Sequence, residues 1–377
     1  MEISKPEGEF LEDPIKLLNN APEILDQGNF FGFGGAKSSF STNFILNGET
    51  YVVWTSKMPG GDWGLSIFNI TLKKLEDHLL VGSKVCFHYL STYPIEANSD
   101  SKKWLYCTDD EGLIRIFNIN EKPFKEIKAF RPKADVNKWA IYSALIFEDK
   151  FNEISESESS QKTYVMVSFQ DPNIPLTICD LDGKTVRDIE RPFDTTCLRM
   201  NLYYDKDLGK THFFCGFTSS GVVMYDLKTE TWGKMFPANN QVTSINCLTR
   251  IVDSKLIKYV VYTQVFNSKI SIGKIDGKEE AIQEINVPNV FDIFDLCVWN
   301  ENSSPCVLVT ACFSAQGEPP HYICLVDFKE GKVLEEKIVL DDYQPVNVMK
   351  VQFKAEGKYK EGIVVLAHRG GGVILYK

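Results

Sequence analysis

A short apolar run recurs along the chain, and every copy except the last closes on Asn or Asp. Two examples are Leu65–Asn69 and Val222–Asp226. The copies end at residues 69, 118, 180, 226, 276, 327 and 377, so the spacings are 49, 62, 46, 50, 51 and 50 residues. A run that is apolar at successive positions predicts a strand covered on both faces. The near-constant interval indicates an internal structural repeat.

Each interval has room for four strands. A polar turn follows the closing residue, and an alternating strand that ends near a proline comes next, as at Trp232–Pro237. Two further β-rich stretches complete the interval, for example Ser244–Val252 and Lys258–Gln264. Four strands of about five to eight residues fill such an interval and leave no room for a long helix. We therefore predict an all-β fold, a seven-bladed β-propeller of four-stranded antiparallel blades, as one domain over residues 1–377.

The two ends of the chain predict how the ring closes. The last apolar run is followed by no further strand, so its blade lacks one. Residues 11–22 resemble the missing strand, because Asp13–Pro22 has the pattern of Lys122–Lys128. We expect this segment to complete the last blade and to cover two sheet edges. The alternative is a short solvated N-terminal tail.

The repeats resemble a divergent WD-repeat propeller over nearly the whole chain. Tyr225-Asp226-Leu227 stands where that family has Trp-Asp, and Phe68-Asn69 and Phe117-Asn118 resemble weakened copies. No repeat carries the family's Gly-His pair, and five histidines are too few for its usual hydrogen-bond network around the ring. We expect the blades to depend more on packing. The resemblance implies a protein-interaction platform but no particular partner, because propellers serve many functions.

The composition excludes several classes of protein. The hydrophobic fraction of 44% favours a globular chain over a disordered one. The formal net charge of -10 disfavours nucleic acid and anionic lipid, so we expect no membrane partner. The first residues contain no apolar run, and the ten cysteines form no C-x-x-C pair. We therefore expect an intracellular protein, cytoplasmic or nuclear and not secreted.

The segments that lead into each innermost strand are the candidate partner site. In WD-type propellers these segments surround one mouth of the central channel, and buried aromatic side chains dominate binding energies at interfaces. The alternative is that Trp139 and Phe291 pack between blades. The candidate residues are Asp135, Lys138, Trp139, Phe193, Asp194, Asn240, Gln241, Phe291, Asp292 and Tyr343.

Two further stretches carry charge. Residues 148–163 form an acidic insertion that we expect to be a flexible loop, and Ser155, three residues before Glu158, fits an acid-directed phosphorylation site. The alternative for this loop is solvated filler. The second stretch is a basic cluster that favours a solvated edge strand over a nucleic-acid contact. Its members are Lys125, Lys128, Arg131, Lys133 and Lys138.

The sequence contains no motif that indicates catalysis. The pairs His212/Cys215 and His321/Cys324 are three residues apart, so on a strand they point to opposite faces and cannot chelate a metal. We expect no metal, no cofactor and no small-molecule ligand. The favoured hypothesis is a non-catalytic scaffold or adaptor subunit of a multiprotein complex. The alternatives are an acidic escort for a basic protein, and a hydrolase with a loop-built site that uses either paired carboxylates or a carboxylate with His368.

Overall fold

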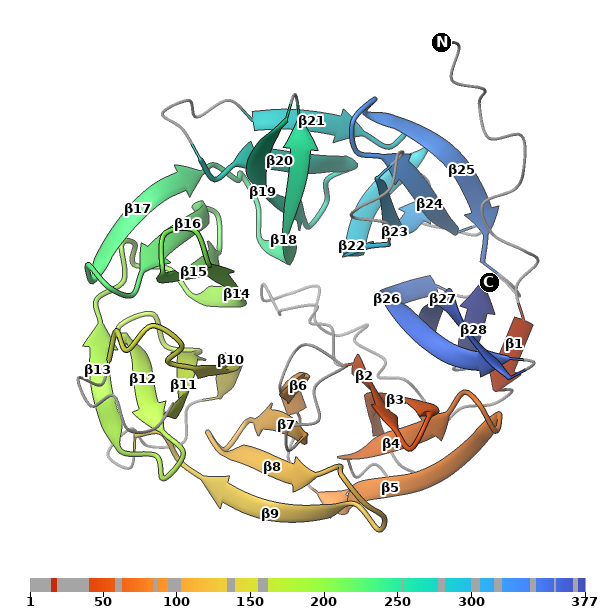
Figure 1. The fold of residues 1–377 in the computed structure, drawn as a ribbon, viewed down its shortest axis with the longest axis horizontal. Coiled ribbons are helices and arrows are strands. Elements are labelled where there is room, and N and C mark those ends of the chain that lie inside the picture. Colours follow the sequence, from red (N-terminus) through yellow and green to blue (C-terminus); the bar gives the residue numbers. More distant parts are fainter. Residues whose placement is uncertain are drawn as a thin grey trace.

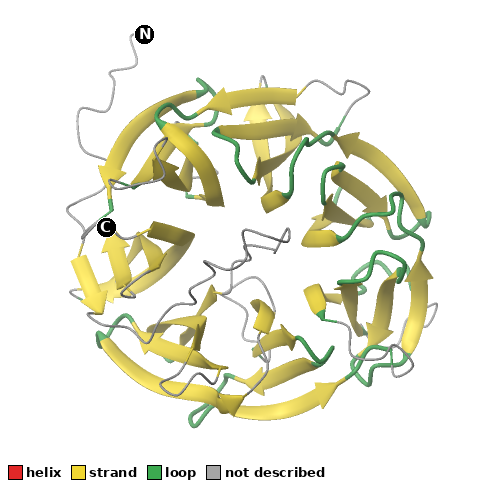
Figure 2. Cartoon of the chain, turned by 180° about the vertical axis from the view of Figure 1, so that it is seen from behind, coloured by secondary structure: helices red, strands yellow, loops and turns green. Residues whose placement is uncertain are grey.

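The computed structural model describes residues 15–18, 41–57, 63–83, 87–93, 103–133, 140–154, 162–252, 254–276, 282–299, 306–314, 321–339, 344–355, 357–368 and 372–376. These residues form seven antiparallel sheets of four strands each. The sheets stand around a central axis as the blades of a propeller (Figure 1), and the reverse view shows the same ring of strands and loops (Figure 2). The predicted all-β, seven-bladed fold is confirmed.

The first four blades follow one another along the chain. Blade 1 contains β2 (Ser41–Leu46), β3 (Glu49–Lys57), β4 (Trp63–Asn69) and β5 (Lys74–Ser83). Blade 2 contains β6 (Phe87–Tyr93), β7 (Trp104–Asp109), β8 (Ile114–Asn118) and β9 (Lys125–Phe130). Blade 3 contains β10 (Ile141–Glu148), β11 (Thr163–Phe169), β12 (Leu176–Asp180) and β13 (Thr185–Ile189). Blade 4 contains β14 (Cys197–Asp205), β15 (Lys210–Phe217), β16 (Gly221–Asp226) and β17 (Thr231–Phe236).

The remaining blades include one that joins distant parts of the chain. Blade 5 contains β18 (Val242–Val252), β19 (Lys255–Gln264), β20 (Lys269–Lys274) and β21 (Ile282–Asn286). Blade 6 contains β22 (Val290–Val298), β23 (Val307–Ser314), β24 (Tyr322–Asp327) and β25 (Lys332–Ile338). Blade 7 contains β26 (Gln344–Ala355), β27 (Lys358–His368), β28 (Gly372–Tyr376) and β1 (Ile15–Leu18). In blade 7, β1 pairs antiparallel with β28, and Ile15 is opposite Leu375.

The hydrophobic core is divided among the blade interfaces. Each of seven buried clusters takes its side chains from two neighbouring blades. Between blades 4 and 5, for example, Phe214 and Val222 pack with Val260 and Tyr262. The third strand of each blade is thus covered on both faces, which explains the apolar runs that mark the repeat.

Side chains also bond neighbouring blades through backbone carbonyls. Thr108 Oγ1 donates to the Ile141 carbonyl at 2.7 Å, and Ser168 Oγ donates to the Cys197 carbonyl at 2.7 Å. Asn201 Nδ2 donates to the Ile245 carbonyl at 2.8 Å, and Asn246 Nδ2 donates to the Leu296 carbonyl at 2.9 Å. These bonds join blades 2 to 3, 3 to 4, 4 to 5 and 5 to 6. They satisfy buried polar groups and fix the registration of the blades.

Candidate functional site

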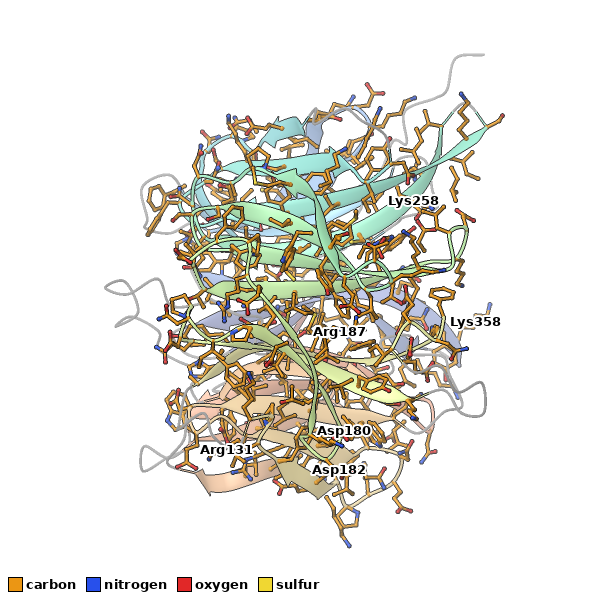
Figure 3. All side chains as sticks on the ribbon, turned by 90° about the vertical axis from the view of Figure 1, so that its left-hand side faces the viewer. Arg131, Asp180, Asp182, Arg187, Lys258 and Lys358 are labelled. Carbon is orange, nitrogen blue, oxygen red and sulfur yellow. The ribbon has the colours of Figure 1, made fainter. Side chains whose placement is uncertain are left out.

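The innermost strands all begin on one face of the ring, which we call the leading face. The opposite face, where these strands turn back into the second strands, is the hairpin face. In Figure 3 Arg131, just after β9, lies toward the leading face, and Lys258 and Lys358 lie toward the hairpin face. The described residues of the predicted partner site, which precede or begin β14, β18 and β22, lie on the leading face.

The innermost strands are bulged where they begin. In β6, β10, β14, β18, β22 and β26 the pairing with the second strand skips one residue at this point. A bulge leaves one residue unpaired and redirects its side chain. The skipped residues are His88, Tyr142, Leu198, Thr243, Phe291 and Val346. Among these residues Leu198, Thr243 and His88 are buried, and Phe291 is exposed on the leading face.

Phe291 and Phe266 form an exposed aromatic pair at the boundary of blades 5 and 6. Phe291 is the bulged residue of β22, and Phe266 lies in the turn between β19 and β20. Their ring centroids are 5.6 Å apart, and the ring planes meet at 48°. Phe266 remains 48% exposed and Phe291 46% exposed. Two large apolar rings are thus held in water and in contact with each other.

The backbone at Phe266 adopts a conformation that phenylalanine avoids. Its φ angle is +54°, in the left-handed region, which costs a bulky residue about 1–2 kcal/mol. Two neighbouring residues hold the turn. The buried Asp292 carboxylate accepts a hydrogen bond from the Phe266 N–H at 3.1 Å, and the Gln241 carbonyl accepts one from the Val265 N–H at 2.8 Å. Strain of this kind persists only where surrounding structure enforces it, and it often accompanies function.

Amide side chains lie in the loops beside the aromatic pair. Gln264 Oε1 accepts hydrogen bonds from the Asn239 N–H at 2.9 Å and the Asn240 N–H at 3.2 Å. Asn267 Oδ1 accepts one from the Lys269 N–H at 3.0 Å, which stabilises the turn after Phe266. Asn239 and Asn286 are exposed. Such amides both donate and accept, as the main chain of a bound peptide requires.

The predicted residues of blade 4 are placed differently. Phe193 is half-buried and packs edge-on against Phe217, with ring centroids 5.6 Å apart. Asp194 is exposed beside it. Arg191 fixes this segment by donating to the carbonyls of Ile174, Thr195, Phe169 and Asp171 at 2.8–3.3 Å. Burial lowers the pKa of Arg191. Phe193 therefore contributes to the core more than to the surface.

The other predicted residues lie outside the described part of the chain. These are Asp135, Lys138, Trp139 and Tyr343 of the partner site, and the phosphorylation candidate Ser155. Of the residues that are described, Gln241 and Asp292 are buried and Asn240 is half-buried. The partner site therefore stays a prediction, and within the described residues Phe291 and Asp194 are its exposed members.

Blades 2 and 3 present a polar cluster on the leading face. The His88 Nε2 contacts Asp110 Oδ1, and the His88 ring lies 5.1 Å from the Tyr142 ring. Burial, and then the charge of Asp110, raises the pKa of Tyr142. A phenol with a raised pKa stays protonated at neutral pH and can donate a hydrogen bond. Among the described residues, no cluster of histidine, cysteine or carboxylate side chains could hold a metal ion.

Two members of the basic cluster found in the sequence form ion pairs with the neighbouring blade. Lys128 Nζ lies 2.5 Å from Asp182 Oδ1, and Lys133 Nζ lies 2.9 Å from Asp188 Oδ2. Both carboxylates belong to the outer part of blade 3, after β12. These pairs favour a structural role for the lysines of β9 and the residues that follow it.

Sequence reasoning missed Phe266 and Arg191. An aromatic residue in a short turn between two strands is a weak signal, because such turns are usually polar. The partner that makes Phe266 notable, Asp292, is 26 residues away in the next blade. Arg191 gives no sequence signal, since its four acceptors are backbone carbonyls.

Comparisons with known proteins match the fold but no family. No family model matches the chain, and no curated protein matches it in sequence. A crystal structure of BBS1N in complex with ARL6DN, soaked with lead, matches with a TM-score of 0.62 and 10% identity. That match covers 90% of this chain and 91% of the other.

A second solved structure has a similar likeness. The crystal structure of Chaetomium thermophilum Raptor matches with a TM-score of 0.59 and 15% identity. The match covers 96% of this chain but only 28% of the Raptor chain. At these identities the likeness shows the propeller fold alone. Among the described residues, no helix is long and apolar enough to span a membrane.

Proposed function

We propose that this chain is a non-catalytic interaction platform that binds a partner protein on its leading face. The observation that carries the proposal is the Phe266–Phe291 pair, because two exposed rings are held in a strained arrangement by a buried carboxylate. Rigid aromatic side chains supply contact area at low entropic cost, and phenylalanine is among the residues enriched in the buried centre of protein interfaces.

The partner that fits this surface is an extended segment with an apolar anchor. The two rings offer a contact for one apolar side chain, and the amides of the flanking loops offer donors and acceptors for main-chain groups. BBS1N, whose fold this chain shares, was crystallised in complex with ARL6DN. This supports a protein as the partner but does not identify it.

The test compares proteins retained by the wild-type chain with those retained by a Phe266→Ala/Phe291→Ala variant. Loss of two anchors should weaken binding of a specific partner by about two to three orders of magnitude, because such anchors contribute about 2 kcal/mol each and about 1.4 kcal/mol corresponds to a tenfold change in affinity. The matched control is Leu72→Ala/Ile127→Ala, since Leu72 and Ile127 are similarly exposed but lie on the outer turns and strands. A folded double phenylalanine variant that retains every partner would overturn the proposal.

A further inference from the structure

Two hairpins project from the hairpin face beyond their neighbours. β18 and β19 have 11 and 10 residues, and β26 and β27 have 12 and 11. The next longest innermost pairs, in blades 4 and 6, have 9 and 8. The extra residues therefore extend the hairpins of blades 5 and 7.

The hairpin of blade 5 rises above blade 4. Lys258 Nζ lies 2.8 Å from Asp205 Oδ1 and 3.0 Å from Asp207 Oδ2, so Lys258 is level with the end of β14. Three more residue pairs follow toward the tip, the last being Val252 with Lys255. At about 3.3 Å per residue the tip stands roughly 10 Å beyond blade 4.

This tip is apolar. Ile251 and Leu256 are directly opposite each other and therefore share one face of the hairpin. Ile251 is 73% exposed and Leu256 49% exposed, and the neighbouring Val252 is also exposed. Lys255 is exposed at the same tip. Removal of these exposed side chains from water on contact with a partner would be favourable.

The hairpin of blade 7 extends beyond the β2–β3 turn of blade 1 by a smaller margin, because one residue pair of blade 1, Leu46 with Glu49, follows Thr50. Thr50 Oγ1 donates to the Gln352 carbonyl, so Gln352 is level with the β2–β3 hairpin. Three more residue pairs follow, the last being Ala355 with Lys358. Tyr359, 57% exposed, lies near this tip with the exposed side chains of Lys354, Lys358 and Lys360.

We propose that these two tips dock the chain onto an anionic membrane surface. Aliphatic side chains at one tip and tyrosine with lysines at the other match the two zones of a lipid interface. The apolar groups enter the acyl boundary, and tyrosine and lysine lie at the headgroups. Both tips are convex and project from the same side of the ring. Contact with a flat, deformable surface requires this arrangement, whereas binding in a preformed protein groove does not.

The charge distribution restricts the contact to one sector of the face. The chain carries a net charge of -10, which is why the sequence predicted no membrane partner. β10 ends at Glu148 and β11 begins at Thr163 on the same face, and the sequence between these two residues is acidic, so an anionic surface repels it. Blades 5 and 7 instead carry exposed lysines at their tips, Lys255 in one and Lys354, Lys358 and Lys360 in the other, so the chain meets the surface tilted toward that sector.

The test is co-sedimentation of the full chain with phosphatidylcholine vesicles, with or without about one third phosphatidylserine. We expect binding to the phosphatidylserine vesicles. Two variants should each reduce that binding by about tenfold or more: Ile251→Asp/Leu256→Asp and Lys354→Glu/Lys358→Glu/Lys360→Glu. The reason is that each lysine near the membrane and each apolar side chain buried in it contributes separately to the binding free energy. Thermal unfolding checks that both variants fold.

Two control variants separate local from general effects. Ile127→Asp/Val186→Asp and Lys74→Glu/Lys125→Glu/Lys184→Glu make the same changes at exposed positions of blades 1 to 3. Both should bind vesicles like the wild-type chain, as should Phe266→Ala/Phe291→Ala, so the outcome is independent of the proposed function. Absence of vesicle binding by the wild-type chain would overturn the proposal. Loss of a protein partner rather than of vesicles in the tip variants would overturn it too and assign the tips to a protein interface.

Discussion

The buried carboxylate of Asp292 holds the backbone N–H of Phe266 at 3.1 Å, across the boundary between blades 6 and 5. Asp292 is only 1% exposed, whereas the ring that it positions is 48% exposed. Replacing it by alanine should remove the support of the turn and leave the Phe266 N–H without this acceptor. We expect a loss of about 1–3 kcal/mol in the free energy of unfolding, measured in urea. We also expect weaker partner binding, although Asp292 itself does not reach the surface.

The conservative Asp292→Asn variant keeps an acceptor, so its stability and its partner binding should lie between those of the wild type and of Asp292→Ala. Equal binding by all three proteins would contradict the role of Asp292.

Phe266→Asn separates stability from binding at the same turn. Asparagine tolerates the left-handed conformation that phenylalanine resists, so relief of strain should offset the lost ring contacts. We expect a free energy of unfolding equal to wild type or higher by up to about 1 kcal/mol, together with loss of partner binding. Urea denaturation and a binding assay on the same preparation test this. A clear loss of stability would show that the ring serves the fold and not recognition.

Asp295, in the inner strand β22, should make stability depend on pH. Burial raises its pKa to about 6, although the nearby Arg199 and hydrogen bonds, including one from the Val348 N–H at 3.1 Å, oppose the rise. The folded state thus binds the proton of the Asp295 carboxyl group more tightly than the unfolded state does, because the pKa of an aspartate in the unfolded chain is near 4. The ionised Asp295 carboxylate therefore lowers the free energy of unfolding. This loss has its full size above pH 6, decreases between pH 6 and 4, and is absent below that range.

The corresponding variant is Asp295→Asn. It should raise the free energy of unfolding at pH 7 by up to about 2–3 kcal/mol, and the gain should shrink as the pH falls toward 4. Urea denaturation across this range measures both quantities. Asp194→Asn removes an exposed aspartate as the control. A gain that is independent of pH would show that the charge of Asp295 is not the cause.

Removal of residues 1–22 tests whether the N-terminal strand closes the ring. β1 pairs with β28, and its loss should leave that edge of blade 7 uncovered. We expect a lower midpoint of thermal unfolding and a tendency to aggregate. Removal of residues 1–10, which leaves β1 intact, is the control. If both shortened chains unfold at the wild-type temperature, ring closure does not depend on β1.

The repeat predicted the fold because each third strand is covered on both faces, and its apolar run is therefore visible in the sequence. Four-stranded blades followed from strand lengths alone. Most contacts of the candidate site were not predictable in this way. Gln241 precedes β18 and Asp292 lies at the start of β22, but their partners, Val265 and Phe266, lie in a turn that the chain reaches by a different strand.

Charge patterns show the same limit. The sequence displays the lysines of β9 as a basic cluster, because it cannot show that Asp182 and Asp188 lie against Lys128 and Lys133. The projecting hairpins were also missed. Their excess length is only two or three residues per strand, and it becomes meaningful only when the level of the neighbouring blade is known.

Within the described part of the chain, every hydrophobic cluster draws its side chains from two neighbouring blades, so no blade has a hydrophobic core of its own. A fragment cut at any repeat boundary would therefore expose two half-clusters, whatever its length. Proteolysis in a loop should be tolerated while the pieces stay associated, but the pieces should not survive separation. The molecule is thus indivisible in practice, and a surface on blade 5 can only be studied in the intact ring.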